Sequence, residues 1–310
     1  MRIEKLNQTT KKNLLEDLLK RSPNSYEMYE EQVKAILDNV KKRGDEALFE
    51  YTEKFDGFCL DQQSVLVKEE EIEEAYTQVD RGLIEIIRKA LKNIETYHEK
   101  QRQYSWFDSK PDGTILGQKV TALDRVGVYV PGGKAAYPSS VLMNIVPAKT
   151  AGVREIIMVT PPGKDGKVTP TTLVAAKEAG ADKIYKVGGA QAIAALAYGT
   201  ESISKVDKIV GPGNIYVALA KKAVYGHVSI DSIAGPSEIL VLADETANPR
   251  YVAADLLSQA EHDEMASAIL VTVSMELAEK VSEQTELFIS QLSRGEIIRK
   301  SLDNYGHILV

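Results

Sequence analysis

The sequence predicts an α/β protein whose parallel sheets are covered by helices on both faces. Three observations lead to this prediction. Short apolar runs alternate with helical patterns over much of the chain, glycine-bearing turns follow several of these runs, and the first hundred residues show only helical periodicity. Continuous apolar strands separated by helices are typical of parallel sheets, because such strands are buried on both faces.

The N-terminal part, residues 1–112, is predicted to be a helical segment that packs on the first α/β domain. Apolar residues recur at helical spacing in residues 33–40, and again in residues 84–94. Gly44 is expected to end the first of these helices, because glycine is a frequent helix stop. Asp45 is expected to cap the helix that follows.

Strands and helices alternate after residue 113. The apolar runs rich in β-branched residues are predicted to be buried strands. They are VGVYV (126–130), IIMVT (156–160), KIYKV (183–187), DKIV (207–210), HVSI (227–230), ILVLA (239–243) and AILVT (268–272). Helical patterns lie between most of them, at residues 141–150, 171–179, 190–198 and 251–260.

Two α/β domains are expected, residues 113–233 and residues 234–310, since the motif IDSIAGPSE interrupts the alternation near the boundary. The chain ends on GHILV, an apolar run that is typical of the beginning or middle of a further strand. An α/β sheet seldom ends without a covering helix. We therefore expect the second domain to be incomplete and the chain to be truncated at its C-terminus.

The composition excludes several classes of protein. The net charge of −7 argues against binding to a nucleic-acid backbone, which requires a basic surface. No stretch approaches the roughly 20 apolar residues that cross a bilayer, and the charged N-terminus lacks the apolar run of a secretory signal. The single cysteine, Cys59, excludes an internal disulfide framework. We therefore expect a cytoplasmic protein.

Glycine-bearing junctions follow four of the predicted strands. They are VPGGKAAYPSS (130–140), VGGAQAIAAL (187–196), VGPGNIYVAL (210–219) and IAGPSEILV (233–241). Ligands of open α/β sheets bind at the carboxyl ends of the strands, where glycine lets the backbone approach a ligand closely. Every α/β fold needs such turns, so a single junction is weak evidence for a ligand site. Four of them, with polar residues placed just inside, indicate a ligand site without identifying the ligand. None is the G-x-G-x-x-G fingerprint, and spacing alone does not indicate NAD.

A second polar group lies in LLSQAEHDE (256–264). If the preceding helix continues, Gln259 and His262 share one face, where an imidazole and an amide oxygen could bind zinc. Zinc prefers about four ligands, so the residues alone favour a simpler interpretation, a polar helix end. Cys59 has no histidine nearby in sequence and is interpreted as structural or incidental.

The order of the motifs resembles one family, the histidinol dehydrogenases. The matching segments extend from Ile36 to Asp263. They are ILDNVKKRGDEAL, YTEKFD, NIETYHEKQ, VGVYVPGG, VLMNIVPAKTAGV, VGGAQAIAALAYGTE, VDKIVGPGN, DSIAGPSEILVLAD and DLLSQAEHD. The resemblance implies two incomplete Rossmann-like domains with parallel sheets. It also implies oxidation of L-histidinol, through L-histidinal, to L-histidine with two NAD, in histidine biosynthesis.

The resemblance assigns roles to individual residues. Tyr129, Gln191 and Asn214 match the family's NAD-contacting positions. Ser237 matches a substrate-binding position. These assignments come from the family's motifs and not from the spacing of the residues.

The resemblance also implies a zinc ion, and in the family this zinc ion holds the substrate. Gln259 and His262 match two of its ligands. The two other zinc ligands, and the Glu-His pair that exchanges protons with the substrate, would fall beyond Val310. No catalytic residue is therefore assigned within the chain, and the chain itself is expected to be inactive. The family forms an intertwined homodimer.

Two other functions stay open. The chain could be a catalytically silent module that binds nucleotide or histidinol weakly. It could also be an unrelated α/β anion-binding protein, if Tyr129, Gln191 and Asn214 do not converge on one cleft. The dehydrogenase assignment further requires Gln259 and His262 to face the crevice onto which the glycine turns open.

Overall fold

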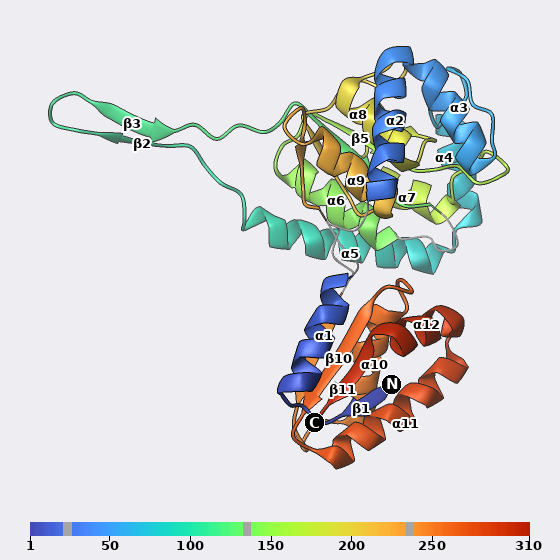
Figure 1. The fold of residues 1–310 in the computed structure, drawn as a ribbon. Coiled ribbons are helices and arrows are strands. Elements are labelled where there is room, and N and C mark those ends of the chain that lie inside the picture. The colour runs from blue at the N-terminus through green and yellow to red at the C-terminus, as the bar shows by residue number, and fades with distance from the viewer. Residues whose placement is uncertain (21–26, 133–137, 234–237) are drawn as a thin grey trace. The chain divides into compact units, whose positions relative to one another are not determined.

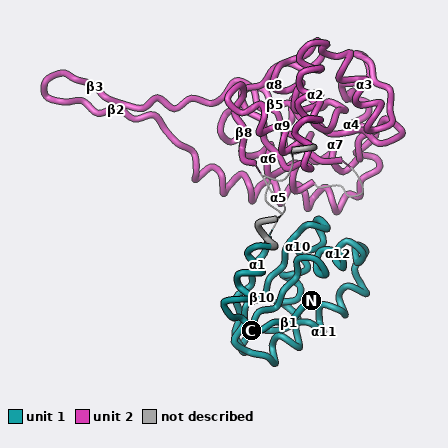
Figure 2. The backbone as a smooth tube through the Cα atoms, viewed as in Figure 1, with its two compact units in different colours: residues 1–27, 234–310 teal, residues 28–233 magenta. Residues whose placement is uncertain are grey.

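The computed structural model describes the whole chain except residues 21–26, 133–137 and 234–237. The chain forms two compact units, each with its own parallel sheet (Figure 2). Unit 1 contains residues 1–27 and 234–310, and unit 2 contains residues 28–233. The predicted α/β class with parallel sheets is therefore confirmed. None of the described helices combines the length and apolar character that a membrane crossing requires.

The sheet of unit 2 has five parallel strands in the order β6-β5-β4-β7-β8. They are β4 (Arg125–Tyr129), β5 (Glu155–Val159), β6 (Lys183–Tyr185), β7 (Lys208–Val210) and β8 (Ser229–Ile230). The chain thus builds outward from β4 to β6, returns to the other side of β4, and continues through β7 to β8. This is the Rossmann order, with its topological switch point between β4 and β7.

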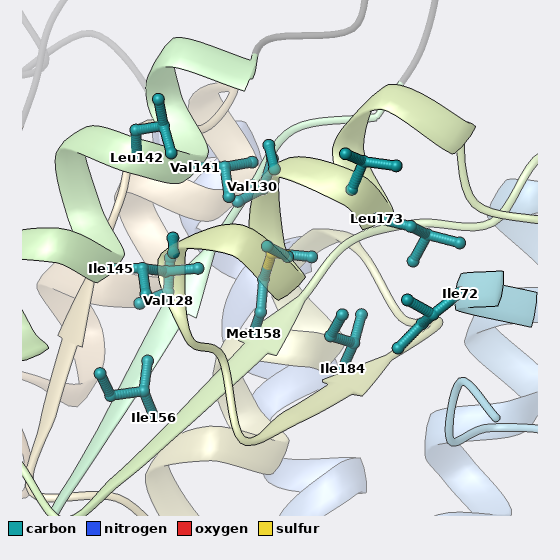
Figure 3. Close-up of a cluster of buried hydrophobic side chains, with 14 of the residues drawn as sticks. Ile72, Val128, Val130, Val141, Leu142, Ile145, Ile156, Met158, Leu173 and Ile184 are labelled. Atoms are coloured by element: carbon teal, nitrogen blue, oxygen red, sulfur yellow. The ribbon is translucent and has the colours of Figure 1, made fainter. Parts of the chain in front are cut away.

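Helices cover both faces of this sheet. They are α2 (Glu27–Arg43), α3 (Asp45–Asp56), α4 (Glu69–Gln78), α5 (Arg81–Glu99), α6 (Pro138–Thr150), α7 (Pro170–Ala179), α8 (Gly189–Tyr198) and α9 (Ile215–Val224). Helices α4 to α7 pack together over the face to which Val128 and Met158 point (Figure 3). On the opposite face, Gly127 contacts Leu196 of α8, and α8 packs against α3 and α9.

A two-stranded antiparallel hairpin extends from unit 2 (Figure 1). It consists of β2 (Trp106–Ser109) and β3 (Ile115–Gln118), and all eight residues are exposed. Strands were predicted only after residue 113, where β3 lies. Strand β2 falls within residues 1–112, which were predicted to be helical, so that prediction is wrong for residues 106–109.

The sheet of unit 1 has four parallel strands in the order β1-β11-β10-β9. They are β1 (Arg2–Glu4), β9 (Glu238–Ala243), β10 (Ser267–Thr272) and β11 (Gly306–Leu309). Its helices are α1 (Gln8–Lys20), α10 (Pro249–Ala260), α11 (Met275–Gln291) and α12 (Gly295–Tyr305). The run GHILV forms β11, a fully buried strand between β1 and β10, as its apolar character predicted.

Two expectations for the N-terminal part differ from the structure. Residues 1–27 belong to unit 1 and not to a segment on the first α/β domain, because β1 pairs with β11. Asp45 does not cap α3; Gly44 holds that position, and Asp45 is the buried first residue of the helix. Its carboxylate instead accepts a hydrogen bond of 2.6 Å from Ser202, a partner more than 150 residues away.

Candidate functional site

The carboxyl edge of the unit 2 sheet brings together three of the predicted glycine junctions. The chain segments that follow β4, β6 and β7 leave the sheet at this edge, and β4 and β7 flank the switch point. Gly211, the first residue after β7, lies against the backbone of Tyr129 so closely that a Cβ atom would overlap its carbonyl oxygen. Gly211 also has a φ of 113°, which favours glycine. The VGPGN junction is therefore pressed against the end of β4.

Tyr129 is the last residue of β4, and its side chain is buried. Its hydroxyl oxygen accepts a hydrogen bond of 3.2 Å from the backbone N–H of Gly189, the first residue of α8. Burial raises the pKa of the Tyr129 phenol to about 12, and the nearby negative charge of Asp56 adds to this shift. Tyr129 is thus a neutral hydroxyl at neutral pH, fixed between the end of β4 and the start of α8.

Gln191 lies in the first turn of α8 and is 1% exposed. Both polar atoms of its amide, Oε1 and Nε2, are buried and have no hydrogen-bond partner. A Cβ atom at Gly189 would lie 2.6 Å from Gln191 Oε1, so glycine is what leaves room for the amide. Buried polar groups in folded proteins are nearly always paired. An amide with neither of its atoms paired therefore indicates a place where a ligand binds.

Asn214 caps helix α9, which follows β7. Its Oδ1 accepts a hydrogen bond of 3.2 Å from the N–H of Val217, and the residue is exposed. Asn214 and Gln191 thus lie in junctions on opposite sides of β4 in the strand order. The structure brings Tyr129 and Gln191 together at Gly189, and it brings the junction that carries Asn214 to the backbone of Tyr129.

Lys221 and Asp231 hold the VGPGN junction in place, and the sequence analysis did not single them out. The Nζ atom of Lys221 donates to the carbonyl of Gly211 at 2.9 Å and forms an ion pair with Asp231. The N–H of Gly211 donates to the other carboxylate oxygen of Asp231 at 2.8 Å. No pattern in the sequence distinguishes Lys221 from its exposed neighbour Lys222, because burial depends on tertiary packing.

A second residue that the sequence analysis missed is Asp56, at the end of α3. Its Oδ2 atom is buried without a hydrogen-bond partner, and burial raises the pKa of the carboxyl to about 6. Asp56 interacts electrostatically with Tyr129 and therefore belongs to the same region. Gly57, which closes the helix in the left-handed conformation, was the one local sign that the chain turns here.

The predicted zinc ligands lie in unit 1, at the end of α10. Gln259 is partly buried in the last turn, and His262 is exposed in the turn that follows. The N–H of His262 donates to the carbonyl of Gln259 at 3.2 Å, so the helix does not continue to His262 as a regular α-helix. The structure describes the two units separately, so the prediction that these side chains face the glycine turns remains a prediction.

The remaining candidates contribute no chemistry to this site. Ser237 lies outside the described residues. Cys59 is exposed, and its hydrogen bond to the Glu53 carboxylate raises the pKa of the thiol, which disfavours the reactive thiolate. This agrees with the interpretation of Cys59 as structural or incidental.

Comparison with known proteins gives one consistent result. The sequence pattern of the family described as histidinol dehydrogenase matches residues 19–310. The chain is 62% identical over 278 residues to histidinol dehydrogenase of Bacillus subtilis, covering 90% of this chain and 65% of that protein. It is also 62% identical over 278 residues to histidinol dehydrogenase of Clostridium acetobutylicum, with 90% and 64% covered.

The fold agrees with these sequence matches. The crystal structure of histidinol dehydrogenase from Elizabethkingia anophelis has a TM-score of 0.88 and is 37% identical, covering 100% of this chain and 71% of that chain. The chain thus spans about 65% of the length of the curated relatives it matches. With most of its sequence matched to the family pattern and its fold matched over its whole length, the chain belongs to the histidinol dehydrogenase family.

Proposed function

We propose that these 310 residues form the NAD-holding part of a cytoplasmic, homodimeric histidinol dehydrogenase, which oxidises L-histidinol to L-histidine through L-histidinal with two NAD. Family membership supports the reaction. One structural observation carries the cofactor assignment: the unpaired amide of Gln191, beside the Tyr129 hydroxyl, at the carboxyl edge of a sheet with Rossmann strand order.

The described residues fit NAD. The Gln191 amide can both donate to and accept from a polar group of the cofactor, and its pairing would remove the penalty of two buried unpaired atoms. Glycines at the ends of β4, β6 and β7 allow the backbone to approach a nucleotide. Tyr129 orients the start of α8, and Asn214 lies at the start of α9, where free N–H groups favour anions. When bound, NAD would supply the hydride acceptor.

The described residues do not form a complete zinc site. No group of three or more His, Cys, Asp or Glu side chains with metal-binding geometry occurs among them. Gln259 and His262 together offer two donors, whereas zinc usually takes about four. In the proposed enzyme they would be two ligands of a site that other residues complete, and they would help to orient the substrate. The proton-transferring Glu-His pair that the family resemblance implies is likewise not assigned within these residues.

Calorimetric titration of NAD into the 310-residue chain tests the cofactor assignment. We expect saturable binding that Gln191→Ala weakens about tenfold, the value of one or two lost hydrogen bonds. The control is Gln291→Ala, because Gln291 is exposed at the end of α11 in unit 1. No binding by the unchanged chain, or equal binding by Gln191→Ala, would contradict the assignment.

The second candidate function is binding without turnover, which is favoured if the proton-transferring pair is absent from these residues. An absorbance assay of NADH separates the two, with NAD, L-histidinol and zinc added to the chain and to a full-length relative such as the Bacillus subtilis enzyme. We expect NADH from the relative and none from the 310-residue chain. Turnover by the chain itself would show that its own residues complete the proton transfer.

A further inference from the structure

Three buried side-chain polar atoms have no hydrogen-bond partner within the part of the chain that the structure describes. Two are the amide atoms of Gln191, and the third is Oδ2 of Asp56. Gln191 lies next to Gly189, which donates to the Tyr129 hydroxyl, and Tyr129 interacts electrostatically with Asp56. The three unpaired atoms therefore belong to one region near Tyr129, and no other buried side-chain polar atom of the described residues lacks a partner.

The packing of α3 on α8 explains why Asp56 reaches this place. At the start of α3, the N–H of Asp45 donates to Glu201 at 2.8 Å, and its carboxylate accepts from Ser202. Both partners follow the end of α8 at Tyr198. The two helices pack against each other. At the other end of α3, Asp56 interacts electrostatically with Tyr129, whose hydroxyl accepts from the first residue of α8. Asp56, the last residue of α3, therefore lies near the carboxyl edge of the sheet, where Gln191 lies in the first turn of α8.

The residues after Asp56 run beside the loop that follows β5. The ring of Phe58 lies directly on Gly166 of that loop, leaving no space for a Cβ atom there. In a Rossmann sheet with this order, β5 is the second strand, and the acidic residue that binds the adenosine ribose of NAD normally follows that strand. Here β5 is followed directly by Thr160, Pro161 and Pro162, none of which is acidic. The one acidic residue further along this loop, Asp165, is exposed, and its Oδ1 already accepts a hydrogen bond of 3.1 Å from the N–H of Lys167.

The only carboxylate on β5 itself, that of Glu155, is already paired, and it lies at the amino end of the strand, away from the carboxyl edge where ligands bind. Glu155 begins the strand, and it forms ion pairs with Arg125 and Lys183. A carboxylate accepts two hydrogen bonds side by side, which suits the adjacent hydroxyls of a ribose. Asp56 offers such a carboxylate, with one buried oxygen unpaired, and the residues after it run beside the loop that has no acidic residue directly after β5.

We propose that Asp56 supplies the acceptor that this sheet lacks: its carboxylate receives the hydroxyl groups of the adenosine ribose of NAD and disfavours NADP. The proposal rests on the proposed function, since it requires NAD to bind unit 2. A ribose that carries a 2′-phosphate would bring a second anion against the Asp56 carboxylate and would lose one of the two donated hydrogen bonds. Asp56 is thus the specificity-determining residue for the unphosphorylated cofactor.

Calorimetric titrations of NAD, NADP and NAD lacking the adenosine 2′-hydroxyl test this. We expect the unchanged chain to bind NAD at least tenfold more tightly than either analogue. Asp56→Asn should weaken NAD binding about tenfold and reduce the preference for NAD over NADP. This variant should bind NAD and the 2′-deoxy analogue with equal affinity. The control is Asp38→Asn, which removes the same charge from an exposed position on α2 of the same unit and should change nothing. Thermal unfolding of each variant establishes that it is folded.

Each outcome decides a separate point. NAD binding that is unchanged in Asp56→Asn overturns the role of Asp56 and leaves the proposed function intact. Weaker NAD binding with the same NAD-to-NADP ratio overturns the assignment to the adenosine ribose. Equal affinity of the unchanged chain for NAD and its 2′-deoxy analogue would also overturn the assignment to the adenosine ribose. Absence of NAD binding by the unchanged chain overturns the proposed function together with the role of Asp56.

Discussion

At the scale of single residues, the candidate site contains polar groups that the fold buries without pairing. Gln191 has two such atoms, and the half-buried Asp56 has one. A buried polar atom without a partner typically costs about 1–3 kcal/mol of folding free energy. The site therefore lowers the stability of the free protein, and the same atoms gain hydrogen bonds when a ligand binds. Substitutions here should raise stability and weaken binding, which is the opposite of their effect in an ordinary core.

Gln191→Leu tests this trade-off directly. Leucine has a similar volume and no polar side-chain atoms. The free energy of unfolding of the variant should therefore be higher by about 1 kcal/mol, while NAD should bind about tenfold more weakly. Chemical denaturation and calorimetric titration on the same preparations measure both effects. A variant that loses stability would show that the amide is paired in the folded protein and would contradict the argument.

Asp56 should make the stability of the protein depend on pH. Its pKa is about 6 in the folded chain, above the ordinary value of 3.8, because burial disfavours the charged form. The folded state therefore binds more protons than the unfolded state between these two values, and stability decreases as the pH rises from about 4 to 6. Above pH 6 the ionised carboxylate is a constant penalty, on the order of 1 kcal/mol after allowance for its solvent exposure.

Urea unfolding of the unchanged chain and of Asp56→Asn between pH 4 and 7.5 measures this contribution. The variant should be the more stable protein at pH 7, and the difference should fall toward zero near pH 4, where both side chains are neutral. A difference that does not vary with pH would mean that Asp56 titrates at its ordinary pKa.

At the scale of elements, the site depends on how the turn between β7 and α9 is held against β4. Lys221 is buried to 4% exposure and binds both the Gly211 carbonyl and the Asp231 carboxylate. Lys221→Met leaves the Gly211 carbonyl without this donor and the Asp231 carboxylate without its cation, although the N–H groups of Gly211 and Ser232 still donate to that carboxylate. We expect a loss of about 2–3 kcal/mol of unfolding free energy, because Asp231 is only partly buried, together with weaker NAD binding.

The adjacent residue provides a matched control. Lys222 is exposed and pairs with Glu30 on the surface, so Lys222→Met should change the unfolding free energy by less than about 0.5 kcal/mol. Equal effects of the two substitutions in denaturant unfolding would refute the role of Lys221 in fixing the turn.

At the scale of the whole molecule, the proposed zinc site would depend on residues that no single element supplies. One predicted ligand, Gln259, lies in the last turn of α10, and the other, His262, lies just beyond it. No group of three or more candidate ligands occurs among the described residues. We therefore expect this 310-residue chain to bind zinc several kcal/mol more weakly than a complete four-ligand site. Competition with a chromophoric chelator measures the affinity, with His262→Ala as the comparison. Tight stoichiometric zinc, lost in His262→Ala, would contradict this expectation.

The sequence by itself determined the local structure. Its apolar runs located the strands β4 to β11, and its glycines located the turns at the carboxyl ends of the strands. Its 3.6-residue periodicity located helices such as α2, α5, α7, α8 and α10, but α4, α11 and α12 were not predicted. These features depend on residues close together in the chain, so a pattern can reveal them. The order of the motifs also identified the family, because long motifs in a fixed order seldom recur by chance.

Only the tertiary structure decided which distant segments meet. It placed β1 beside β11, across almost the whole length of the chain, and it gave Asp45 a buried partner in Ser202 instead of a capping role. It also buried Asp56 and Gln191 without partners at the start of α8. Burial and pairing depend on the order of strands in a sheet and on the direction in which helices cross it. Local propensity does not encode either. The family's motifs had already assigned Tyr129, Gln191 and Asn214, whereas Asp56 and Lys221 emerged only from the folded chain.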